Sequence, residues 1–424
     1  MEAETCKKEL VIEIPPDVVR RETESVTAQY RRLARIPGFR RGHAPASLVH
    51  TRFRKDIQTE VVQSLLPKFF ETAVKDQKLS VVGQPHFEEL KFEDDQPLTC
   101  KASFEVYPDF ELKEYKGLVA EEEPVIVKDE DVEQTLEKLR ERAATFEVVQ
   151  DRAAADDDHL TVSYEGRDPR DSESQPVEAR EAVVHLGGEG TVPAFTQNLR
   201  GTKTGEVREF EVAYPADYPQ KSLAAKTYRY RVEVQAIKRK VLPALDDDLA
   251  KTVSEFQRLE ELRQKVRKDL QESRAQRAEN ATKQNLLEQL VKLHEFPVPQ
   301  ALVEGQLDRK LENTLARLLA QGIDPRTIDV DWRKIREESR PDGEKDVRGS
   351  LILEKITEAE KIEVSDEEVD NVIREMAGER REAPAALKTR LTRDGALDRI
   401  KSSRRNQKAL ELVYRSAKIN RKSE

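Results

Sequence analysis

The sequence predicts an α+β protein of several domains: an α/β N-terminal domain, an antiparallel β domain with one short helix, and an extended all-α C-terminal domain. Of the 424 residues, 37% are apolar and 37% are charged, whereas an ordinary domain has about 45–50% and about 25%. The apolar spacing is helical at first, has a period of two between about residues 152 and 240, and is helical again after Leu242–Pro243. Small domains on extended helices therefore fit better than one large core.

Composition excludes several classes of protein and of site. No stretch approaches the roughly 18–20 consecutive apolar residues of a membrane span, and the first residues lack a secretory leader, so we expect a cytosolic protein with no membrane partner. Cys6 and Cys100 form no CxxC pair and are expected to be reduced thiols. The histidines are scattered, and we find no phosphate loop and no strand-linked GxGxxG, so we expect no metal, nucleotide or other cofactor.

The N-terminal domain is expected to combine strands with two helices. A strand covers Glu9–Ile14, and Pro15–Asp17 start the first helix. A second helix is predicted by apolar residues at helical spacing, namely Val61, Val62, Leu65, Leu66, Phe69, Phe70 and Val74. A strand over Cys100–Val106 ends this region.

The first helix and the loop after it form a basic segment. Between Arg20 and Lys55, ten Lys and Arg residues stand against Glu22 and Glu24, which is a local charge of +8 in a chain whose formal net charge is −9. Such asymmetry marks a surface for a polyanion or an acidic partner.

An acidic arm and a β-rich domain follow. From Asp109 the charge becomes negative, and apolar residues at helical spacing predict one amphipathic arm helix with Val132, Leu136, Leu139, Ala143 and Phe146. A period of two predicts strands in HLTVSYEG, AVVHLGG, EVREFEVAY and TYRYRVEVQAI, with a short helix in PAFTQNLR. This stretch is a domain of roughly ninety residues.

After Leu242–Pro243 we expect only helices. Leucines and valines at helical spacing, such as Leu286, Leu287, Leu290 and Val291, are expected to pack their own helix bundle, although a bundle of arms can also touch unfolded chains. The fourteen residues 271–284 carry no large apolar side chain, so this part of a helix, about 20 Å long, is expected to project or bridge rather than be buried.

Two features mark the end of the helical region. Ser365–Glu368 has the form of a capping box, which starts a helix. The last helix is expected to run from Leu397 to about Ala417. The tail that follows, with Lys418, Arg421 and Lys422, is expected to fray.

The loop from residue 36 to residue 45 is the most informative segment. Gly38 and Gly42 permit backbone conformations that other residues avoid, and prolines restrict the two ends. Between the glycines the loop would present three residues on a short exposed hairpin: Phe39, Arg40 and Arg41. An apolar ring beside two guanidinium groups suits bidentate pairing with phosphate or carboxylate together with a small apolar pocket. The alternative is a solvated loop whose Phe39 packs under its own helix.

At this loop the sequence begins to resemble a known family. The run Gly38-Phe39-Arg40-Arg41-Gly42-His43-Ala44-Pro45 is similar to the ribosome-docking signature GFRxGKxP of bacterial trigger factor, and the order of domains matches over essentially the whole chain. The resemblance implies contact with protein and ribosomal RNA of the large subunit beside the exit tunnel, through Gly38, Phe39, Arg40, Arg41, Gly42, His43 and Pro45. His43 stands where the family usually has Lys, and because a histidine is mostly neutral at pH 7 the charge of that contact is weaker.

The β-rich domain resembles the FKBP-type prolyl isomerases. The similarity rests on Tyr164–Gly166, Thr191–Phe195, Tyr214–Tyr218 and Tyr228–Tyr230. It implies a proline pocket lined by Tyr164, Val192, Phe195, Tyr218 and Tyr230. Two family positions are missing, because Ser163 replaces an acidic residue and the polar run 171–177 replaces a Phe-acidic pair. Aromatic residues on alternating strands are also the usual core of a small sheet, which is the alternative interpretation.

Together these resemblances imply an ATP-independent chaperone that docks at the ribosome, keeps newly synthesised chains open, assists their folding and export, and isomerises X–Pro bonds. The domains would span residues 1–112 (ribosome binding), 113–150 (arm helix), 151–240 (FKBP-like) and 241–424 (helical, client-binding). The partners would be the ribosome and nascent or unfolded polypeptides, and a homodimer is left open. Two alternatives remain: a stand-alone prolyl isomerase whose helices dimerise it, and a general RNA-binding protein that uses the basic segment.

Overall fold

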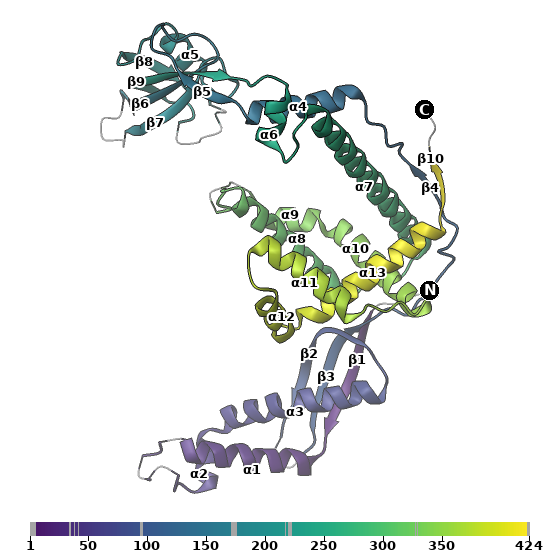
Figure 1. Cartoon of the computed structure of the whole chain (residues 1–424). Coiled ribbons are helices and arrows are strands. Elements are labelled where there is room, and N and C mark those ends of the chain that lie inside the picture. Colours follow the sequence, from purple (N-terminus) through teal and green to yellow (C-terminus); the bar gives the residue numbers. More distant parts are fainter. Residues whose placement is uncertain are drawn as a thin grey trace. The chain divides into compact units, whose positions relative to one another are not determined.

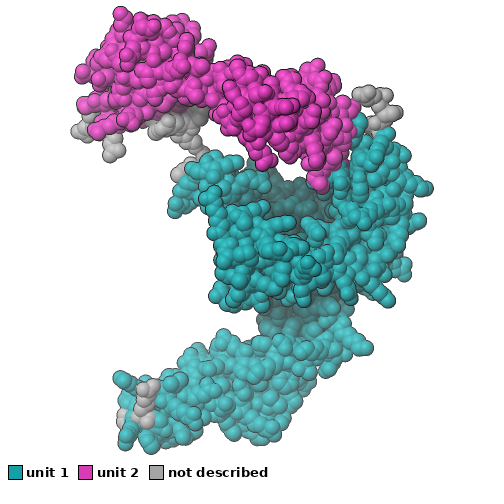
Figure 2. Space-filling model, in the orientation of Figure 1, with its two compact units in different colours: residues 1–124, 279–424 teal, residues 125–278 magenta. Residues whose placement is uncertain are grey.

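The computed structural model describes residues 6–33, 35–37, 39–40, 42–93, 96–170, 176–216, 218, 223–326, 328 and 330–421. The chain forms two compact units (Figure 2): unit 1 contains Met1–Pro124 and Glu279–Glu424, and unit 2 contains Val125–Ala278. Helices and strands occur as an α/β N-terminal part, an antiparallel β domain and a helical C-terminal part (Figure 1), which confirms the predicted fold class. Within the described ranges, no helix is both long enough and apolar enough to cross a membrane.

Unit 1 begins with an antiparallel sheet of three strands and the helices that cover it. The strands lie in the order β1-β3-β2, and α1 and α3 lie side by side (Figure 1). Their bounds are β1 Lys7–Ile14, α1 Pro16–Leu33, α2 Ala46–Arg52, α3 Arg54–Asp76, β2 Val81–Lys91 and β3 Leu98–Val106. Every second residue of β3 is buried, because one face of the sheet packs on α3. Cys6 and Cys100 are buried and free, as expected.

The remainder of unit 1 is mainly helical. Its elements are β4 Val119–Glu122, the second part of α7 Leu259–Leu293, α8 Gln300–Ala320, α9 Trp332–Glu338, α10 Arg340–Ala359, α11 Asp366–Arg380, α12 Pro384–Arg393, α13 Ala396–Ser416 and β10 Lys418–Arg421. Leu286 and Leu290 of α7 are fully buried in one core with residues of α8, α10 and α13, so these leucines pack the bundle. The capping box is confirmed, because Ser365 and Glu368 each accept the other's backbone N–H, at 3.3 and 2.9 Å.

The N-terminal sheet and the helical part of unit 1 meet at the start of α8. Helix α8 has no capping side chain of its own at Pro299. Instead, the carboxylate of Glu105 in β3 accepts a hydrogen bond from the backbone N–H of Ala301 at 2.7 Å. The Sγ of Cys6 also donates to the carbonyl of Pro297 at 3.3 Å. Glu105 therefore caps the N-terminus of α8 from a strand that is distant in the sequence.

The described C-terminal residues do not fray. Lys418–Arg421 form β10, which pairs in parallel with β4. Glu122 of β4 is buried, accepts a hydrogen bond from the hydroxyl of Tyr414 at 2.6 Å, and forms an ion pair with Arg421 at 3.0 Å. The expectation of fraying was wrong because composition does not reveal a strand partner 299 residues earlier in the chain. Lys422 lies outside the described residues.

In unit 2, helices α4 Asp129–Arg142 and α6 Asp247–Val253 pack with the first part of α7 around Val132, Leu136 and Leu262. The predicted arm helix is therefore present. It ends at Arg142, and Phe146, which we expected on the same helix, lies in the strand β5 and is 50% exposed. That expectation was wrong because the three-residue spacing between Ala143 and Phe146 fits a helical pattern, although the helix ends at Arg142.

Helix α7 runs unbroken through residues 271–284 and contributes to both units. Most of this polar stretch is exposed, as expected, but Ala278 and Thr282 are buried, at 8% and 2% exposed. The expectation that the whole stretch stays out of the core was therefore wrong at these two positions, since a small side chain can be buried without being a large apolar one.

The β domain of unit 2 is an antiparallel sheet with the order β5-β9-β6-β7, and β8 pairs with β9. The bounds are β5 Thr145–Val148, β6 Asp158–Arg167, β7 Val177–His185, α5 Pro193–Leu199, β8 Val207–Ala213 and β9 Thr227–Val241. All four alternating segments are strands and the short helix is present, as predicted. Leu160, Val162 and Val234 are fully buried on one face of the sheet, which we call its inner face.

Candidate functional site

The inner face of the β domain carries a cluster of aromatic side chains. Side chains alternate along a strand, so Tyr228 and Tyr230 of β9 both lie on this face with Val232. Pro193 starts helix α5, which places Phe195 in the same core. The aromatic cluster consists of Tyr164, Phe195, Phe210, Tyr214, Tyr218, Tyr228 and Tyr230.

Tyr230 lies at the centre of the aromatic cluster. It is 2% exposed, and its ring centroid is 5.1 Å from that of Phe195 and 5.7 Å from that of Tyr164, in edge-to-face arrangements. Its hydroxyl is hydrogen-bonded to the hydroxyl of Tyr214 at 2.8 Å. This bond satisfies both buried hydroxyls, and together with the ring contacts it fixes the position of the Tyr230 ring.

The packing of Tyr230 explains why the residue after Tyr164 and Glu165 is a glycine, Gly166. A Cβ at Gly166 would lie 2.5 Å from Cε1 of Tyr230, which is closer than real Cβ contacts. The Tyr230 ring therefore packs directly on the backbone of β6.

The hydroxyls of Tyr214 and Tyr230 stay protonated at neutral pH. Burial raises the pKa of Tyr230, and its hydrogen bond to Tyr214 raises it further. Burial likewise raises the pKa of Tyr214. The centre of the cluster therefore offers apolar ring surface and a neutral pair of hydroxyls.

The structure brings the five predicted pocket residues together. Phe195 and Tyr230 are buried in the core of the β domain, and Tyr164, Val192 and Tyr218 are half-buried and pack against that core. The sequence interpretation missed three members of the cluster, Phe210, Tyr214 and Tyr228. The alternation of β8 and β9 contained the signal for Phe210 and Tyr228, but the hydroxyl pair of Tyr214 was not predictable from spacing.

The basic loop is fixed at its base and exposed at its tip. Ile36, Ala44 and Val49 are buried in a small core with Tyr30 and Phe53. The rings of Tyr30 and Phe53 are 5.6 Å apart. This core joins the last turns of α1 to α2 and holds both ends of the loop, so the loop does not depend on its tip for its position.

Phe39 does not pack under its own helix. Its side chain is 44% exposed, and Arg40 and His43 are also exposed. The N–H of His43 donates to the carbonyl of Arg40 at 2.9 Å, and Gly42 has a φ of +83°, a left-handed conformation that favours glycine. The alternative of a tucked ring is therefore wrong. Gly38 and Arg41 lie outside the described residues.

The loop continues a basic and partly apolar surface. Arg31 and Arg35 are exposed next to it, and so are the side chains of Leu33 (68%) and Leu48 (40%). Pro45 is exposed and precedes α2. Apolar side chains beside guanidinium groups suit a partner that has both an apolar pocket and negative charge.

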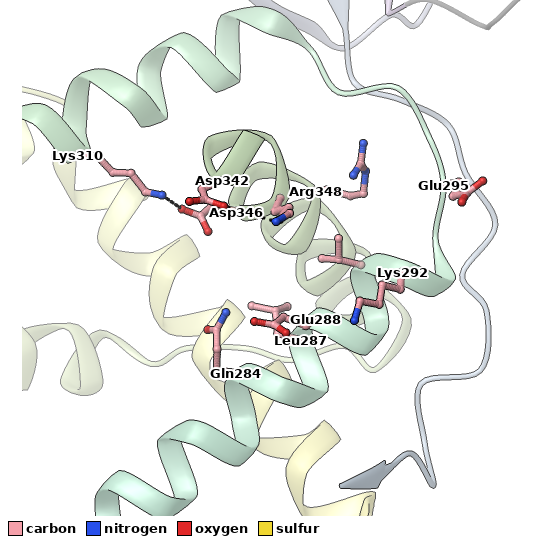
Figure 3. A pocket seen from close by; sticks show the side chains of 11 residues that line it. Gln284, Leu287, Glu288, Lys292, Glu295, Lys310, Asp342, Asp346 and Arg348 are labelled. Atoms are coloured by element: carbon pink, nitrogen blue, oxygen red, sulfur yellow. Dashed lines mark ion pairs between the residues drawn. The ribbon is translucent and has the colours of Figure 1, made fainter. Parts of the chain in front are cut away.

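A cleft of about 760 Å³ lies between α7, α8 and α10 in unit 1 (Figure 3). Leu287 and Val291 of α7 supply its apolar surface, and Lys310 and Asp346 form an ion pair at 2.7 Å on its edge. Its other lining residues are Gln284, Glu288, Lys292, Glu295, Asp342, Lys345 and Arg348. The mixture of a small apolar floor with charges of both signs suits weak contact with many sequences rather than tight binding of one ligand.

Family models match the chain in three parts. The model described as bacterial trigger factor protein (TF) matches residues 1–139, FKBP-type peptidyl-prolyl cis-trans isomerase matches residues 150–235, and bacterial trigger factor protein (TF) C-terminus matches residues 258–415. The trigger factor of Koribacter versatilis (strain Ellin345) is 42% identical over 411 residues, which cover 96% of this chain and 94% of that protein. This chain belongs to the trigger factor family.

Two further comparisons agree with this assignment. The trigger factor of Solibacter usitatus (strain Ellin6076) is 35% identical over 415 residues, 98% of each chain. A solved structure of the trigger factor chaperone, described for promiscuous substrate recognition in folding and assembly, matches with a TM-score of 0.50 at 22% identity and covers 98% of both chains. The likeness to that structure shows the shared fold.

As a member of the trigger factor family, the chain is a chaperone that carries an FKBP-type isomerase domain, and docking at the ribosome is the role of this family. Neither alternative is favoured. A stand-alone isomerase does not account for the matched N-terminal and C-terminal parts, and a general RNA-binding protein does not account for the FKBP-type domain.

The sequence departs from the FKBP-type pattern at two places, Ser163 and the polar run 171–177. Ser163 accepts a hydrogen bond from the side-chain amide of Gln235 at 2.6 Å, so a neutral pair occupies the place of the expected acidic group. Residues 171–175 lie outside the described residues. Val177, at the end of the same polar run, packs against the aromatic cluster.

Proposed function

We propose that this trigger factor docks on the large ribosomal subunit near the exit tunnel, contacting ribosomal protein and rRNA through Gly38, Phe39, Arg40, Arg41, Gly42, His43 and Pro45. The observation that carries this proposal is the exposure of Phe39. Phe39 is a large apolar ring that is exposed on a loop with a buried base, so its burial by a partner would favour binding. The neighbouring Arg40 supplies a donor fork for phosphate or carboxylate.

For the FKBP-type domain we propose prolyl isomerase activity at the aromatic cluster. The X–Pro amide has a rotation barrier of about 18–20 kcal/mol that arises from resonance. The twisted amide has lost conjugation and is less well solvated, so an apolar cup of aromatic rings stabilises it relative to the planar form. This reaction needs no nucleophile and no proton transfer, which agrees with the raised pKa of the buried Tyr230 hydroxyl. Tyr164, Val192, Phe195, Tyr218 and Tyr230 would form the cup.

For the helical part we propose weak contact with nascent and unfolded polypeptides. The cleft of Figure 3 is one contact, with Leu287 and Val291 as its apolar floor. Uncatalysed isomerisation of X–Pro bonds takes tens to hundreds of seconds, so holding a chain open while an isomerase acts on it is physically sensible.

The same proposal includes the division of the chain and its location. The functional parts would be residues 1–112, 113–150, 151–240 and 241–424, in a cytoplasmic chaperone. Separate buried cores in the N-terminal part, the β domain and the helical part support this division. A homodimer of the free chaperone is tested by sedimentation velocity of the protein without ribosomes.

Co-sedimentation with ribosomes tests the docking proposal. The wild-type protein should pellet with 70S ribosomes at physiological salt, and the variant Phe39→Ala/Arg40→Ala/Arg41→Ala should stay in the supernatant. Arg21→Ala is the matched control, because Arg21 is an exposed arginine of the same basic segment that pairs with Asp17 on α1. If the triple variant pellets as well as the control does, the docking assignment is wrong.

A protease-coupled assay with a proline peptide tests the isomerase proposal. The full-length protein should accelerate isomerisation, and Tyr164→Ala should reduce kcat/KM by at least about tenfold, because it removes one wall of the proposed cup. Phe146→Ala is the control, since Phe146 is an exposed aromatic residue of the same domain outside the cluster. A wild-type rate equal to the uncatalysed one would reduce the domain to a scaffold.

A further inference from the structure

The face of the β-domain sheet opposite the aromatic cluster carries its own apolar surface. Three large apolar side chains are exposed there: Phe146 (50%), Val148 (57%) and Val183 (67%). They come from β5 and β7, the two ends of the β5-β9-β6-β7 order. They lie outside the inner core, so the packing of the domain does not explain why large apolar side chains stand at these exposed positions.

The strand register places these side chains on one continuous surface. Lys238 of β9 is the pairing partner of both Val148 and His159, and His159 is also the partner of His185. Directly paired residues share a face, so these side chains form a row across four strands. Phe146 pairs with Lys240 in the next row on one side, and Val183 pairs with Thr161 in the next row on the other side. The outer patch is defined as Phe146, Val148, His159, Val183, His185, Lys238 and Lys240.

Three rings pack together in the middle of the outer patch. The imidazoles of His159 and His185 are stacked, with centroids 4.2 Å apart and an interplanar angle of 12°. The ring of Phe146 meets His159 edge-on at 4.9 Å. Burial lowers the pKa of His159, and the neighbouring His185 lowers it further, so this ring is uncharged at neutral pH.

Positive charge flanks the rings. Lys238 and Lys240 form no ion pair with any described residue. The acidic group at the other end, Asp157, lies 3.6 Å from Nε2 of His185 and is itself exposed. Two lysines therefore remain available for a partner, which gives the outer patch a preference for negative charge beside its apolar surface.

We propose that the outer patch binds extended, unfolded polypeptide segments in which apolar side chains are flanked by Asp or Glu. This inference rests on the chaperone function, and it adds a client contact that is separate from the aromatic cluster. The row of rings and the two β-branched side chains suit an extended chain, whose alternate side chains point to the same surface. The lysines then pair with the acidic flanks of that chain.

Site-specific crosslinking in the full-length protein reads the outer patch directly. A photoreactive phenylalanine analogue is placed at position 183 and, as a matched control, at position 11, since Val11 is also a strand valine and is 72% exposed. The probe is a fluorescein-labelled, proline-free peptide of Phe and Leu flanked by Glu, and a second peptide carries Lys in place of Glu. We expect at least about fivefold more crosslinking from position 183 to the acidic peptide than to the basic one, and little from position 11.

Variants separate the outer patch from the remainder of the molecule. Lys238→Glu/Lys240→Glu should reverse the preference between the two peptides. Phe146→Ser should weaken crosslinking from position 183 by about fivefold and leave proline-peptide turnover unchanged. Equal labelling by both peptides, or no effect of either variant, would overturn the proposal. Competition by a single-stranded oligonucleotide as effective as by the acidic peptide, or labelling of a second copy of the chain instead of the peptide, would also overturn it.

A third crosslinker position distinguishes this proposal from the chaperone function on which it rests. Val291 lines the cleft between α7, α8 and α10. Crosslinking of peptides from position 291 without crosslinking from position 183 would leave the client contact of the helical part in place and refute the outer patch alone. Absence of crosslinking from both positions, with no suppression of aggregation of an unfolded protein, would refute client binding itself.

Discussion

Replacement of Gly166 by alanine tests whether the Tyr230 ring is fixed against the backbone of β6. The added Cβ would lie 2.5, 2.8 and 2.9 Å from Cε1, Cδ1 and Cζ of Tyr230, whereas carbon atoms prefer separations of about 3.5–4.0 Å. The ring would have to withdraw by about 1 Å. It cannot do so freely, because it is 2% exposed, packs on Phe195 and is hydrogen-bonded to Tyr214.

The magnitude follows from these contacts. Overpacking of a filled core costs about 1–3 kcal/mol, and loss of the hydroxyl pair adds about 0.5–1.5 kcal/mol, so we expect Gly166→Ala to destabilise the β domain by about 2–4 kcal/mol. Amide hydrogen exchange of the full-length protein measures this locally. Exchange in Thr227–Val241 and Asp158–Arg167 should accelerate by about thirty-fold to a thousand-fold. Prolyl isomerase activity should fall with it, since the ring that moves is in the proposed cup.

A matched glycine provides the control for this experiment. A Cβ at Gly190 would meet no atom within 4 Å, so Gly190→Ala should leave exchange unchanged. Combining Gly166→Ala with Tyr230→Leu removes the ring that is struck, so the double variant should be less destabilised than the sum of the two single ones. If Gly166→Ala exchanges like Gly190→Ala, the ring is not fixed as described and the argument fails.

Three further predictions concern other parts of the chain. The lowered pKa of His159 means that this side chain takes up a proton at lower pH in the folded domain than in the unfolded chain, so the stability that neutral His159 contributes is present above about pH 6.5 and is lost as the pH falls. The thermal unfolding temperature of His159→Gln should therefore depend less on pH between about 7 and 5 than that of the wild type. An unchanged pH dependence would contradict this. Glu105→Ala should destabilise the first turn of α8 by about 0.5–2 kcal/mol, seen as faster exchange there, and unchanged exchange would show that the helix start does not need the Glu105 cap. Glu122→Ala removes the partner of Tyr414 and Arg421, so limited trypsin digestion should cleave near Lys418 sooner than in the wild type, and equal cleavage rates would mean that backbone pairing alone holds β10.

Strands β6, β7, β8 and β9 of the FKBP-type domain were predictable because their pattern is local. In β9 the buried residues Tyr228, Tyr230, Val232 and Val234 alternate with exposed ones over most of its length, as a sheet with one packed face requires. Strand β2 was not predictable in this way. Its register shifts twice, and Gly83 and Glu89 adopt positive φ, so the alternation that marks a strand is interrupted.

Elements that depend on distant partners escaped the sequence interpretation. Nothing near Lys418–Arg421 indicates a strand, because the strand exists only through its pairing with Val119–Glu122. Strand β5 also depends on a distant partner. Phe146 continues the helical spacing of the arm, but it lies in a strand because it pairs with Lys240 of β9. Tertiary pairing decided the structure of both segments over their local pattern.

The candidate sites were predictable to different depths. The composition of the basic loop indicated a docking surface, and the buried residues Ile36 and Val49 then explain why Phe39 stays exposed. For the β domain, the family resemblance supplied the five residues proposed for the pocket, but the central position of Tyr230 depends on the hydroxyl of Tyr214 and on the absence of a side chain at Gly166. These are three-dimensional contacts that no spacing along the sequence contains.

The affinity of the full-length protein for vacant ribosomes, measured at several salt concentrations, tests most directly the claim that this trigger factor docks through its basic loop. We predict that Arg40→Ala lowers the affinity and reduces the slope of log K against log salt by about one, because one charge contact is lost. Phe39→Ala should lower the affinity by about tenfold or more without changing the slope, because an apolar contact releases no counterions. Unchanged affinity and slope in both variants would contradict docking through this loop.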